Sequence, residues 1–132
     1  MQIAILGAGN VGVTLGKGWQ KAGHTVIYGT REPSQTKFDD LNGASVAGFA
    51  DAVKDADVVA ITLPFAAIYD VLPTLGDLSD KVIIDITNPV KADFSGLEPL
   101  EGSSSHEVAK LLHSNKVVKA FNTVGFNVMA DP

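Results

Sequence analysis

The sequence predicts an α/β fold in which a single doubly wound parallel sheet, with the strand order 3-2-1-4-5-6, carries helices on both faces. Short apolar runs of strand length alternate along the chain with segments whose apolar residues recur at helical spacing. The strand-like runs are almost continuously apolar, as is typical of parallel strands buried on both faces. The length of 132 residues suits one compact domain, so we expect a single domain over residues 1–132.

Composition excludes several classes of protein. Hydrophobic residues make up 45% of the chain and charged residues 19%, which is enough apolar material for a core and argues against disorder. The absence of cysteine excludes disulfides, thiolate metal sites and a cysteine nucleophile, and we expect no metal. The net charge of −5 argues against a nucleic-acid partner. No apolar run reaches the roughly 18 residues that cross a bilayer, so we expect a cytoplasmic protein without a membrane partner.

The first strand and the turn after it predict the ligand. Residues 2–6 form an apolar run, and residues 7–12 follow it directly with the glycine spacing G-x-G-x-x-G. Gly7 permits a sharp turn, Gly9 lets the backbone approach a pyrophosphate, and Gly12 lets the helix pack closely on the sheet. Free N–H groups at the start of the helix favour negative charge. A strand before this motif and a helix after it predict a dinucleotide-binding Rossmann fold, with an ordinary tight turn as the alternative.

The first helix is expected to end at Gly23. Its helical spacing runs through Val11, Leu15, Gly18 and Ala22. Gly12 and Gly16 lie one turn apart on a neighbouring stripe, which predicts close approach to a strand. Trp19 is expected in the core or on the flank of the helix. His24, at the turn into the second strand, is interpreted as structural rather than catalytic.

The end of the second strand indicates which dinucleotide is bound. Proteins that bind NAD place Asp or Glu about 20 residues past the glycines, where its carboxylate accepts a hydrogen bond from the ribose 2′-hydroxyl. Here Gly29, Thr30 and Arg31 hold that place. Thr30 can donate a hydrogen bond, and Arg31 can stack on adenine or bind a 2′-phosphate through its forked guanidinium, which favours NADP(H). Glu32 would favour NAD if the strand shifted by one residue, and Lys37 is more simply a solvated surface lysine than a phosphate ligand.

The middle of the chain predicts a binding edge at the end of the fourth strand. The segments are an irregular stretch at 33–43 with helical turns around Phe38 and Leu41, a third strand at 44–47, a helix at 48–56 and a central fourth strand at 58–63. Pro64 ends this strand at its carboxyl end, where open α/β sheets bind ligands. Phe65 either faces the cofactor or packs at the start of the next helix, and both readings stay open.

The last third of the chain completes the alternation. It predicts a helix at 66–78 bent or split at Pro73, a strand at 81–85, a loop at 90–102, a helix from 104, a strand at 116–121 and the opening of a helix at 126–130. Asp85 is either a carboxylate of the site or, as favoured here, an anchor for its own loop. Ser104 and Glu107 have the spacing of a capping box. Ser104 and His106 alone do not predict hydrolase chemistry, since a base from another element and an oxyanion site are lacking.

Five motifs, at residues 4–12, 28–31, 61–65, 85–89 and 118–123, occur in this order along the chain. Together they resemble the coenzyme F420-dependent NADP oxidoreductase family. A related NADP-binding domain occurs in membrane metalloreductases, whose transmembrane part this chain lacks. The resemblance implies pyrophosphate contacts from the glycine-rich turn, a 2′-phosphate site at the end of the second strand, and positions around the nicotinamide and the deazaflavin. The cofactor-binding residues expected in these three groups are Gly7, Ala8, Gly9, Asn10, Val11 and Gly12, then Thr30 and Arg31, then Leu63, Pro64, Phe65, Asn88, Pro89, Asn122 and Thr123.

The resemblance also implies a reaction. Members of the family transfer hydride between C4 of the nicotinamide of NADP(H) and C5 of the deazaflavin F420. Such transfer mainly needs two rings held face to face, so no catalytic side chain is assigned. Members usually continue into a helical portion that helps form the second-cofactor site and a homodimer, and that portion is absent here. The chain is therefore expected to be a fragment of such an enzyme or a short relative that binds NADP without that acceptor.

Three functions remain open from the sequence. The first is an NADP(H)-dependent oxidoreductase, or its cofactor-binding domain, whose small-molecule electron acceptor is F420 or another flavin-like compound. The second is a non-catalytic module that binds or senses NADP(H) and acts on a partner. The third is the nucleotide domain of a hydroxyacid or pyrroline-carboxylate type dehydrogenase, which would require a downstream substrate domain.

Overall fold

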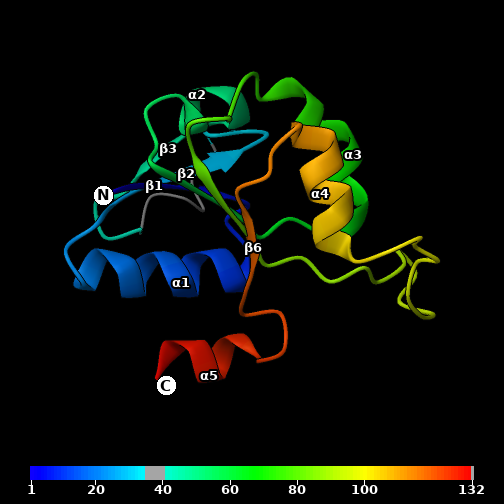
Figure 1. Cartoon of the computed structure of the whole chain (residues 1–132). Helices are drawn as coiled ribbons and strands as arrows, with labels where there is room; N and C mark the ends of the chain where they lie inside the picture. The colour runs from blue at the N-terminus through cyan, green and yellow to red at the C-terminus, as the bar shows by residue number, and fades with distance from the viewer. Residues whose placement is uncertain (35–40, 132) are drawn as a thin grey trace.

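The computed structural model describes residues 1–34 and 41–131. Its centre is a six-stranded parallel sheet with the order β3-β2-β1-β4-β5-β6, which confirms the predicted order (Figure 1). The strands are β1 (Gln2–Leu6), β2 (Thr25–Thr30), β3 (Ser45–Gly48), β4 (Val58–Ile61), β5 (Val82–Asp85) and β6 (Val117–Lys119). β1 and β4 lie at the centre, and the chain reverses its direction of progress across the sheet between them.

Helices cover both faces of the sheet. They are α1 (Asn10–Lys21), α2 (Phe49–Val53), the 3₁₀-helix η2 (Phe65–Ala67), α3 (Ile68–Val71), the 3₁₀-helix η3 (Leu72–Thr74), α4 (Ser104–Leu112) and α5 (Phe126–Ala130). In Figure 1, α1 and α5 lie on one face, and α2, α3 and α4 on the other. One apolar cluster includes Val53, Ile68 and Val108 from the second group of helices. A second cluster includes Leu15 of α1, and Met129 of α5 packs against it.

The central strand β1 contributes to both clusters. Ala4 and Leu6 belong to the cluster beneath α2, α3 and α4, whereas Ile3 and Ile5 belong to the cluster beneath α1. Successive side chains of a strand point to opposite faces, so a strand covered on both sides needs apolar residues at every position. This double coverage explains the continuous apolar runs that predicted the parallel sheet.

The glycines of α1 bring the helix against the sheet, as predicted. A Cβ atom added at Gly12 would lie 2.1 Å from the carbonyl oxygen of Gly7. A Cβ added at Gly16 would lie 2.0 Å from the phenol oxygen of Tyr28 and 2.9 Å from Cδ1 of Ile5. The Tyr28 hydroxyl is buried and has no hydrogen-bond partner among the described residues, and burial raises the pKa of this phenol from 10.0 to about 12. No larger residue fits at position 16 without moving Tyr28.

Several element ends differ from their predicted positions for local reasons. β4 ends at Ile61 instead of residue 63, and the hydroxyl of the next residue, Thr62, donates to the backbone carbonyl groups of Leu6 and Gly7. β6 ends at Lys119 instead of residue 121, and Phe121 has a left-handed φ of 64° that takes the chain out of the sheet. The helix predicted at 66–78 divides into η2, α3 and η3, with Pro73 in the first turn of η3, which confirms the predicted split.

The predicted capping box of α4 is wrong by one residue. Ser103, not Ser104, is the N-cap, and its Oγ accepts the backbone N–H of His106 at 3.2 Å. Ser103 has the extended backbone, φ −85° and ψ 160°, that a capping residue requires. Ser104 is the first helical residue, and its buried hydroxyl accepts a hydrogen bond from Lys119 instead. Three consecutive serines made the cap ambiguous from sequence.

Trp19 agrees with its predicted packing on the helix flank, whereas the structural interpretation of His24 stays a prediction. Trp19 is half-buried on the flank of α1 and meets the ring of Phe121 edge to face, with the centroids 6.4 Å apart. Nδ1 of His24 lies 3.3 Å from the N-terminal amine. Leu41 is buried, and the predictions for Lys37 and Phe38 fall outside the described residues. Within the described ranges, no helix is both long and apolar enough to cross a membrane.

Candidate functional site

The glycine-rich turn leaves the start of α1 open. Gly7 has a φ of 110°, a conformation that favours glycine, and its N–H donates to the carbonyl of Gly29 in β2 at 3.0 Å. Gly9 is the N-cap of α1 and supplies no side chain to the first-turn amides. A Cβ added at Gly9 would meet no atom within 4 Å among the described residues. The N–H groups of the first turn therefore face open space, which is the arrangement that accepts a phosphate.

Thr62 holds this turn in place. Its Oγ1 lies 3.0 Å from the carbonyl oxygen of Leu6 and 2.9 Å from that of Gly7, so its single proton is shared between them. A Cβ added at Gly7 would lie 3.0 Å from the same hydroxyl. Sequence reasoning assigned Thr62 no role of its own. The available signal was a polar residue within the apolar run predicted as the fourth strand, which is the neighbour of β1 in the predicted order.

The end of β2 presents a hydroxyl and a guanidinium together. Thr30 is 7% exposed, and its Oγ1 has no hydrogen-bond partner among the described residues. The next residue, Arg31, is exposed and lines a hollow of 210 Å³ with Phe49, Asp70, Val71 and Thr74. A buried hydroxyl without a partner has a cost that a ligand can remove, and beside a guanidinium that ligand is most favourably an anion. Glu32 lies beyond the last residue of β2 and is exposed.

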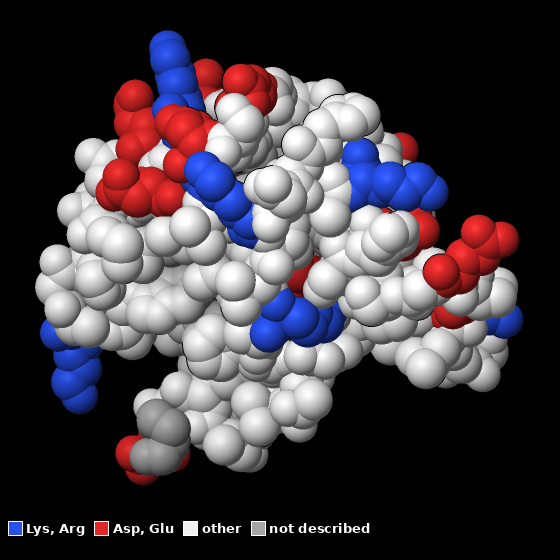
Figure 2. Space-filling view, viewed as in Figure 1, with Lys and Arg blue, Asp and Glu red and all other residues white. Residues whose placement is uncertain are grey.

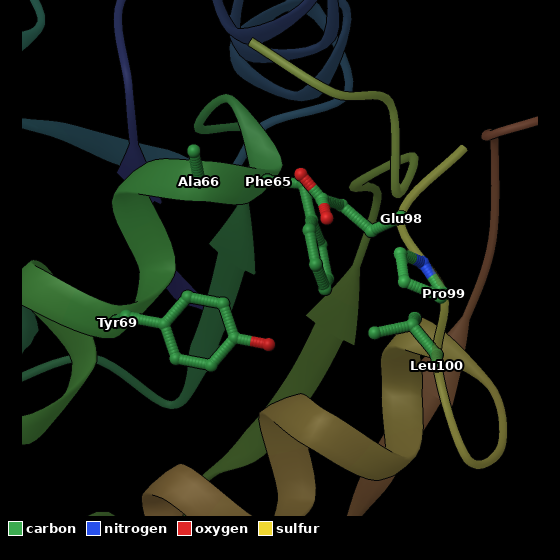
Figure 3. A pocket seen from close by; sticks show the side chains of 6 residues that line it. All are labelled: Phe65, Ala66, Tyr69, Glu98, Pro99 and Leu100. Atoms are coloured by element: carbon green, nitrogen blue, oxygen red, sulfur yellow. The ribbon is translucent and has the colours of Figure 1, made fainter. Parts of the chain in front are cut away.

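The exit from β4 is apolar. Leu63 and Phe65 are 9% and 3% exposed and belong to the core, while Pro64 between them is exposed. Phe65 begins η2, so the packing interpretation of this residue is confirmed. Its ring also forms one wall of a hollow of 280 Å³, with Tyr69 on one side and Glu98, Pro99 and Leu100 on the other (Figure 3). Packing and ligand contact are therefore compatible at Phe65.

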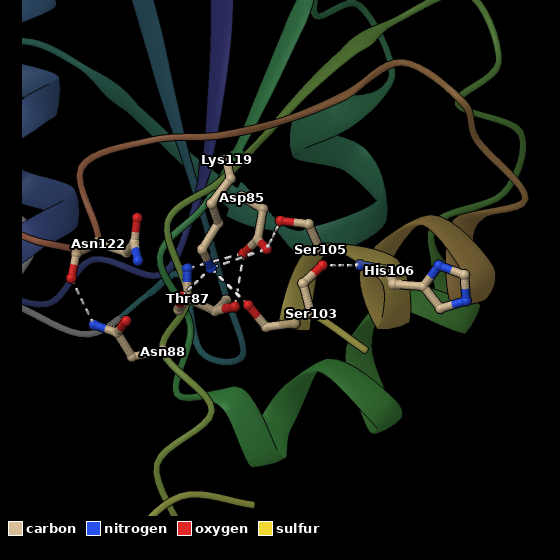
Figure 4. A network of polar contacts seen from close by, with 9 residues as sticks. Asp85, Thr87, Asn88, Ser103, Ser105, His106, Lys119 and Asn122 are labelled. Carbon is tan, nitrogen blue, oxygen red and sulfur yellow. Dashed lines mark hydrogen bonds and ion pairs between the residues drawn. The ribbon is translucent and has the colours of Figure 1, made fainter. Parts of the chain in front are cut away.

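Asp85, at the end of β5, is an anchor as predicted. It is completely buried, and its Oδ1 accepts the backbone N–H of Thr87 at 2.9 Å and the Thr87 hydroxyl at 2.7 Å. Its Oδ2 accepts the Ser105 hydroxyl at 2.8 Å and Nζ of Lys119 at 3.1 Å (Figure 4). Lys119 also donates to Oγ of Ser104 at 2.7 Å and to the carbonyl of Thr87. This network ties the loop after β5 to β6 and to the first turn of α4.

The loops after β5 and β6 are joined directly. Nδ2 of Asn88 donates to the carbonyl oxygen of Asn122 at 3.1 Å (Figure 4). Asn88 and Thr123 are exposed, and Pro89 and Asn122 are half-buried. The predicted residues of these two loops therefore lie beside each other at the carboxyl edge of the sheet, and the Asp85 network fixes the backbone that carries them.

The sheet brings all the predicted site residues to one edge. They follow β1, β2, β4, β5 and β6, whose carboxyl ends share that edge in a parallel sheet. In the described part of the chain, no group of three or more His, Cys, Asp and Glu residues could hold a metal ion. On the face shown in Figure 2, acidic side chains gather around α2 and on the loop before α4, and Lys and Arg form no continuous patch among the described residues. Anions must therefore be bound by local geometry.

Comparison with known proteins identifies the family of this chain. A family model described as "NADP oxidoreductase coenzyme F420-dependent" matches residues 2–89. The chain belongs to this family. The glycine-rich turn, the end of β2, the exits from β4 and β5 and the anchor Asp85 all lie in the matched segment. The resemblance carried by the five sequence motifs is confirmed.

Three individual relatives each match between 93% and 100% of this chain. The F420-dependent NADP reductase of Methanothermobacter thermautotrophicus is 31% identical over 150 residues, which cover 99% of this chain and 65% of the relative. The metalloreductase STEAP3 of Rattus norvegicus is 28% identical over 93% of this chain and 25% of its own length. A crystal structure from Arthrobacter sp. FB24, proposed to be an F420-dependent NADP reductase, superposes with a TM-score of 0.89 at 30% identity, over 100% of this chain and 67% of that one. The chain thus spans less than two thirds of the curated relatives it matches.

Proposed function

We propose that this chain binds NADP(H) along the carboxyl edge of its sheet and holds it for exchange of hydride with F420 or another acceptor. The observation that carries the proposal is the buried hydroxyl of Thr30, which has no hydrogen-bond partner in the described ranges, beside the exposed guanidinium of Arg31. These two groups stand where proteins that bind NAD carry a carboxylate. Family membership and the names of the F420-dependent relatives support the same cofactor.

The phosphates are assigned to the first turn of α1 and to the end of β2. The first-turn amides of α1, carried by Ala8 to Gly12 around the open position of Gly9, would hold the pyrophosphate. Thr30 and Arg31 would hold the 2′-phosphate, and the hollow between Arg31 and Asp70 on α3 would take the adenine. Thr62 contributes by keeping the glycine-rich turn in its bent conformation.

The nicotinamide end is assigned to the exits from β4, β5 and β6. Leu63, Pro64 and Phe65 would form the apolar side, and the bridged loops with Asn88, Pro89, Asn122 and Thr123 the polar side. When bound, the cofactor supplies or accepts a hydride at C4 of its nicotinamide. The role of these residues is positioning, so we assign no catalytic side chain. A cytoplasmic location and a homodimer stay predictions from the sequence.

Calorimetric titration with NADPH and NADH tests the cofactor. Two charge-assisted contacts to the 2′-phosphate predict that NADPH binds about 10- to 100-fold more tightly. Arg31→Ala should lower NADPH affinity about ten-fold and leave NADH affinity almost unchanged, whereas Lys110→Ala, an exposed lysine on α4, should change neither. Tighter binding of NADH to the unaltered chain would overturn the assignment.

The Thr30→Val variant tests whether the Thr30 hydroxyl contacts the ligand or stabilises the protein. Because the Thr30 hydroxyl has no partner among the described residues, its removal should not destabilise the free protein but should weaken NADPH binding. Stopped-flow mixing of the NADPH complex with F420 then tests the acceptor. Loss of the F420 absorption supports hydride transfer, whereas binding without turnover favours the alternative, a module that holds or senses NADP(H).

A further inference from the structure

A second hollow lies beside the edge proposed for the nucleotide. It has a volume of 280 Å³ and opens between η2 and α3 on one side and the loop before α4 on the other (Figure 3). Its walls are Phe65, Ala66, Tyr69, Glu98, Pro99 and Leu100. The volume lies just below the roughly 300–1,000 Å³ of pockets for drug-sized ligands, so it suits a molecule with a single ring.

The aromatic wall is fixed in position. Phe65 is 3% exposed within the core. The ring of Tyr69 meets it edge to face, with the centroids 5.8 Å apart and the planes at 89°. The Tyr69 hydroxyl donates to Oε2 of Glu107 on α4 at 3.3 Å, which orients the phenol. The hollow therefore has two aromatic rings held at right angles.

The opposite wall is carried by a folded loop. The N–H of Glu98 donates to the carbonyl oxygen of Pro89 at 2.7 Å, and Val90 and Leu97 form an antiparallel bridge. Leu100 packs against the core cluster beneath α4. Both ends of the Glu98–Leu100 wall are thus attached to the body of the protein, which places Glu98 at the hollow.

The hollow is electronegative. Partial burial, then the charge and hydrogen bond of Glu107, then the charge of Glu98 hold the pKa of the Tyr69 phenol above its ordinary value. The carboxylates of Glu107 and Glu98 therefore both affect the Tyr69 hydroxyl. None of the six residues that line the hollow is a lysine or arginine. A carboxylate or phosphate group would meet repulsion here, whereas a cation would be attracted by the carboxylates and by the ring faces.

We propose that this hollow binds a small organic cation, an ammonium group attached to one ring or a comparable apolar body. The apolar part would contact Phe65, Pro99 and Leu100, and the ammonium would lie near Tyr69 and Glu98. The inference uses none of the phosphate-binding groups of α1 and β2, and it shares only Phe65 with the residues proposed for the nicotinamide. It divides the edge into a side for anions and a hollow for a cation.

Three probes with the same ring and different charge test the proposal on the full chain. Benzylammonium, benzyl alcohol and benzoate are titrated in turn and followed by amide chemical shifts in ¹⁵N NMR. Benzylammonium should shift the resonances of residues 65–69 and 98–100 and bind about two- to five-fold more tightly than benzyl alcohol, the effect of a partly exposed charge pair. Benzoate should bind most weakly. Equal affinity for the three probes, or shifts confined to other residues, would refute the proposal.

Two carboxylate variants separate a local effect from net charge. Glu98→Gln keeps the side-chain shape and should remove the preference for benzylammonium over benzyl alcohol. Glu101→Gln is the matched control, because Glu101 is exposed in the same loop and does not line the hollow. Equal losses in both variants would show that net charge alone attracts the probe, and the proposal would fail. NADPH titration of both variants should match the unaltered chain, so this result is distinguishable from failure of the nucleotide assignment.

Discussion

Gly16→Ala tests how closely α1 is packed on the sheet. The added Cβ would lie 2.0 Å from the Tyr28 phenol oxygen, 2.7 Å from its Cζ and 2.9 Å from Cδ1 of Ile5. Tyr28 is completely buried, so its ring has no open space to move into. Overpacking of a core costs about 1–3 kcal/mol, and an overlap of this size places the cost near the upper value. Alanine gains about 1 kcal/mol of helix propensity over glycine, so the net loss of stability should be about 2 kcal/mol.

The Tyr28→Phe background supplies the decisive comparison. It removes the atom nearest to the new Cβ, and it removes a hydroxyl that has no partner among the described residues. Tyr28→Phe alone should therefore stabilise the protein by about 1 kcal/mol. In this background the added Cβ still lies 2.7 Å from Cζ of this ring and 2.9 Å from Cδ1 of Ile5, so Gly16→Ala should cost about 1 kcal/mol. The difference between the two backgrounds gives a coupling energy of about 1 kcal/mol.

Urea denaturation followed by far-UV circular dichroism measures all four proteins of this cycle. The slopes of the transitions should agree, so that the midpoints report stability. An equal cost of Gly16→Ala in both backgrounds would refute the close contact between Gly16 and Tyr28. A gain in stability from Gly16→Ala in the unaltered chain would refute it as well.

The same pair of proteins gives a pH dependence with a defined sign. Burial raises the pKa of Tyr28 from 10.0 to about 12, so the folded state favours the neutral phenol. The stabilisation is complete below pH 10 and is lost as the pH rises from 10 toward 12, by about 2 to 3 kcal/mol at most. Tyr28→Phe should lack this part of the alkaline loss. Parallel stability curves for the two proteins above pH 10 would contradict the burial of the phenol.

Two further substitutions test the supports of the binding edge. Lys119→Met removes the cation from the buried carboxylate of Asp85 and should cost about 2 kcal/mol in urea denaturation, less than a fully buried pair because the lysine side chain is 28% exposed. Lys116→Met, at an exposed lysine nearby in the sequence, should change the free energy of unfolding by no more than about 0.5 kcal/mol. Equal costs of the two substitutions would show that the network does not stabilise the fold. Thr62→Val removes the hydroxyl that lies against the Gly7 carbonyl and should cost about 1 kcal/mol. It should also weaken NADPH binding in calorimetry, and unchanged binding would show that the turn keeps its shape without Thr62.

Local patterns carried the parts of the fold that sequence could predict. The glycine-rich turn lies within six residues of β1, and each of its glycines meets a backbone requirement that the spacing G-x-G-x-x-G indicates. The strand order followed from apolar runs that alternate with helical spacing, and the double coverage of β1 is visible in its own five residues. The cap of α4 was misplaced because Ser103, Ser104 and Ser105 are equivalent until the backbone conformation of each is known.

The polar network could not be predicted in the same way. Its members stand at positions 85, 87, 104, 105 and 119, and only the passage of the chain from β5 through α4 to β6 brings them together. Asp85 alone gave a signal, because Asp before a proline-containing turn is a common anchor. Lys119 lies in an otherwise apolar strand, and nothing local indicates that its ammonium turns back to a buried carboxylate.

The proposed division of the edge between anions and a cation agrees with the topology. The chain leaves β1 for β2 in one direction and later places β4 on the other side of β1, so the loops at the carboxyl ends diverge at this point. The loops on the β1 and β2 side contribute backbone amides, Thr30 and Arg31, all donors. The loops on the β4 and β5 side contribute Phe65, Tyr69 and Glu98, which are aromatic or acidic. Opposite preferences for charge can coexist on one edge because the two groups of loops start from opposite sides of the switch point.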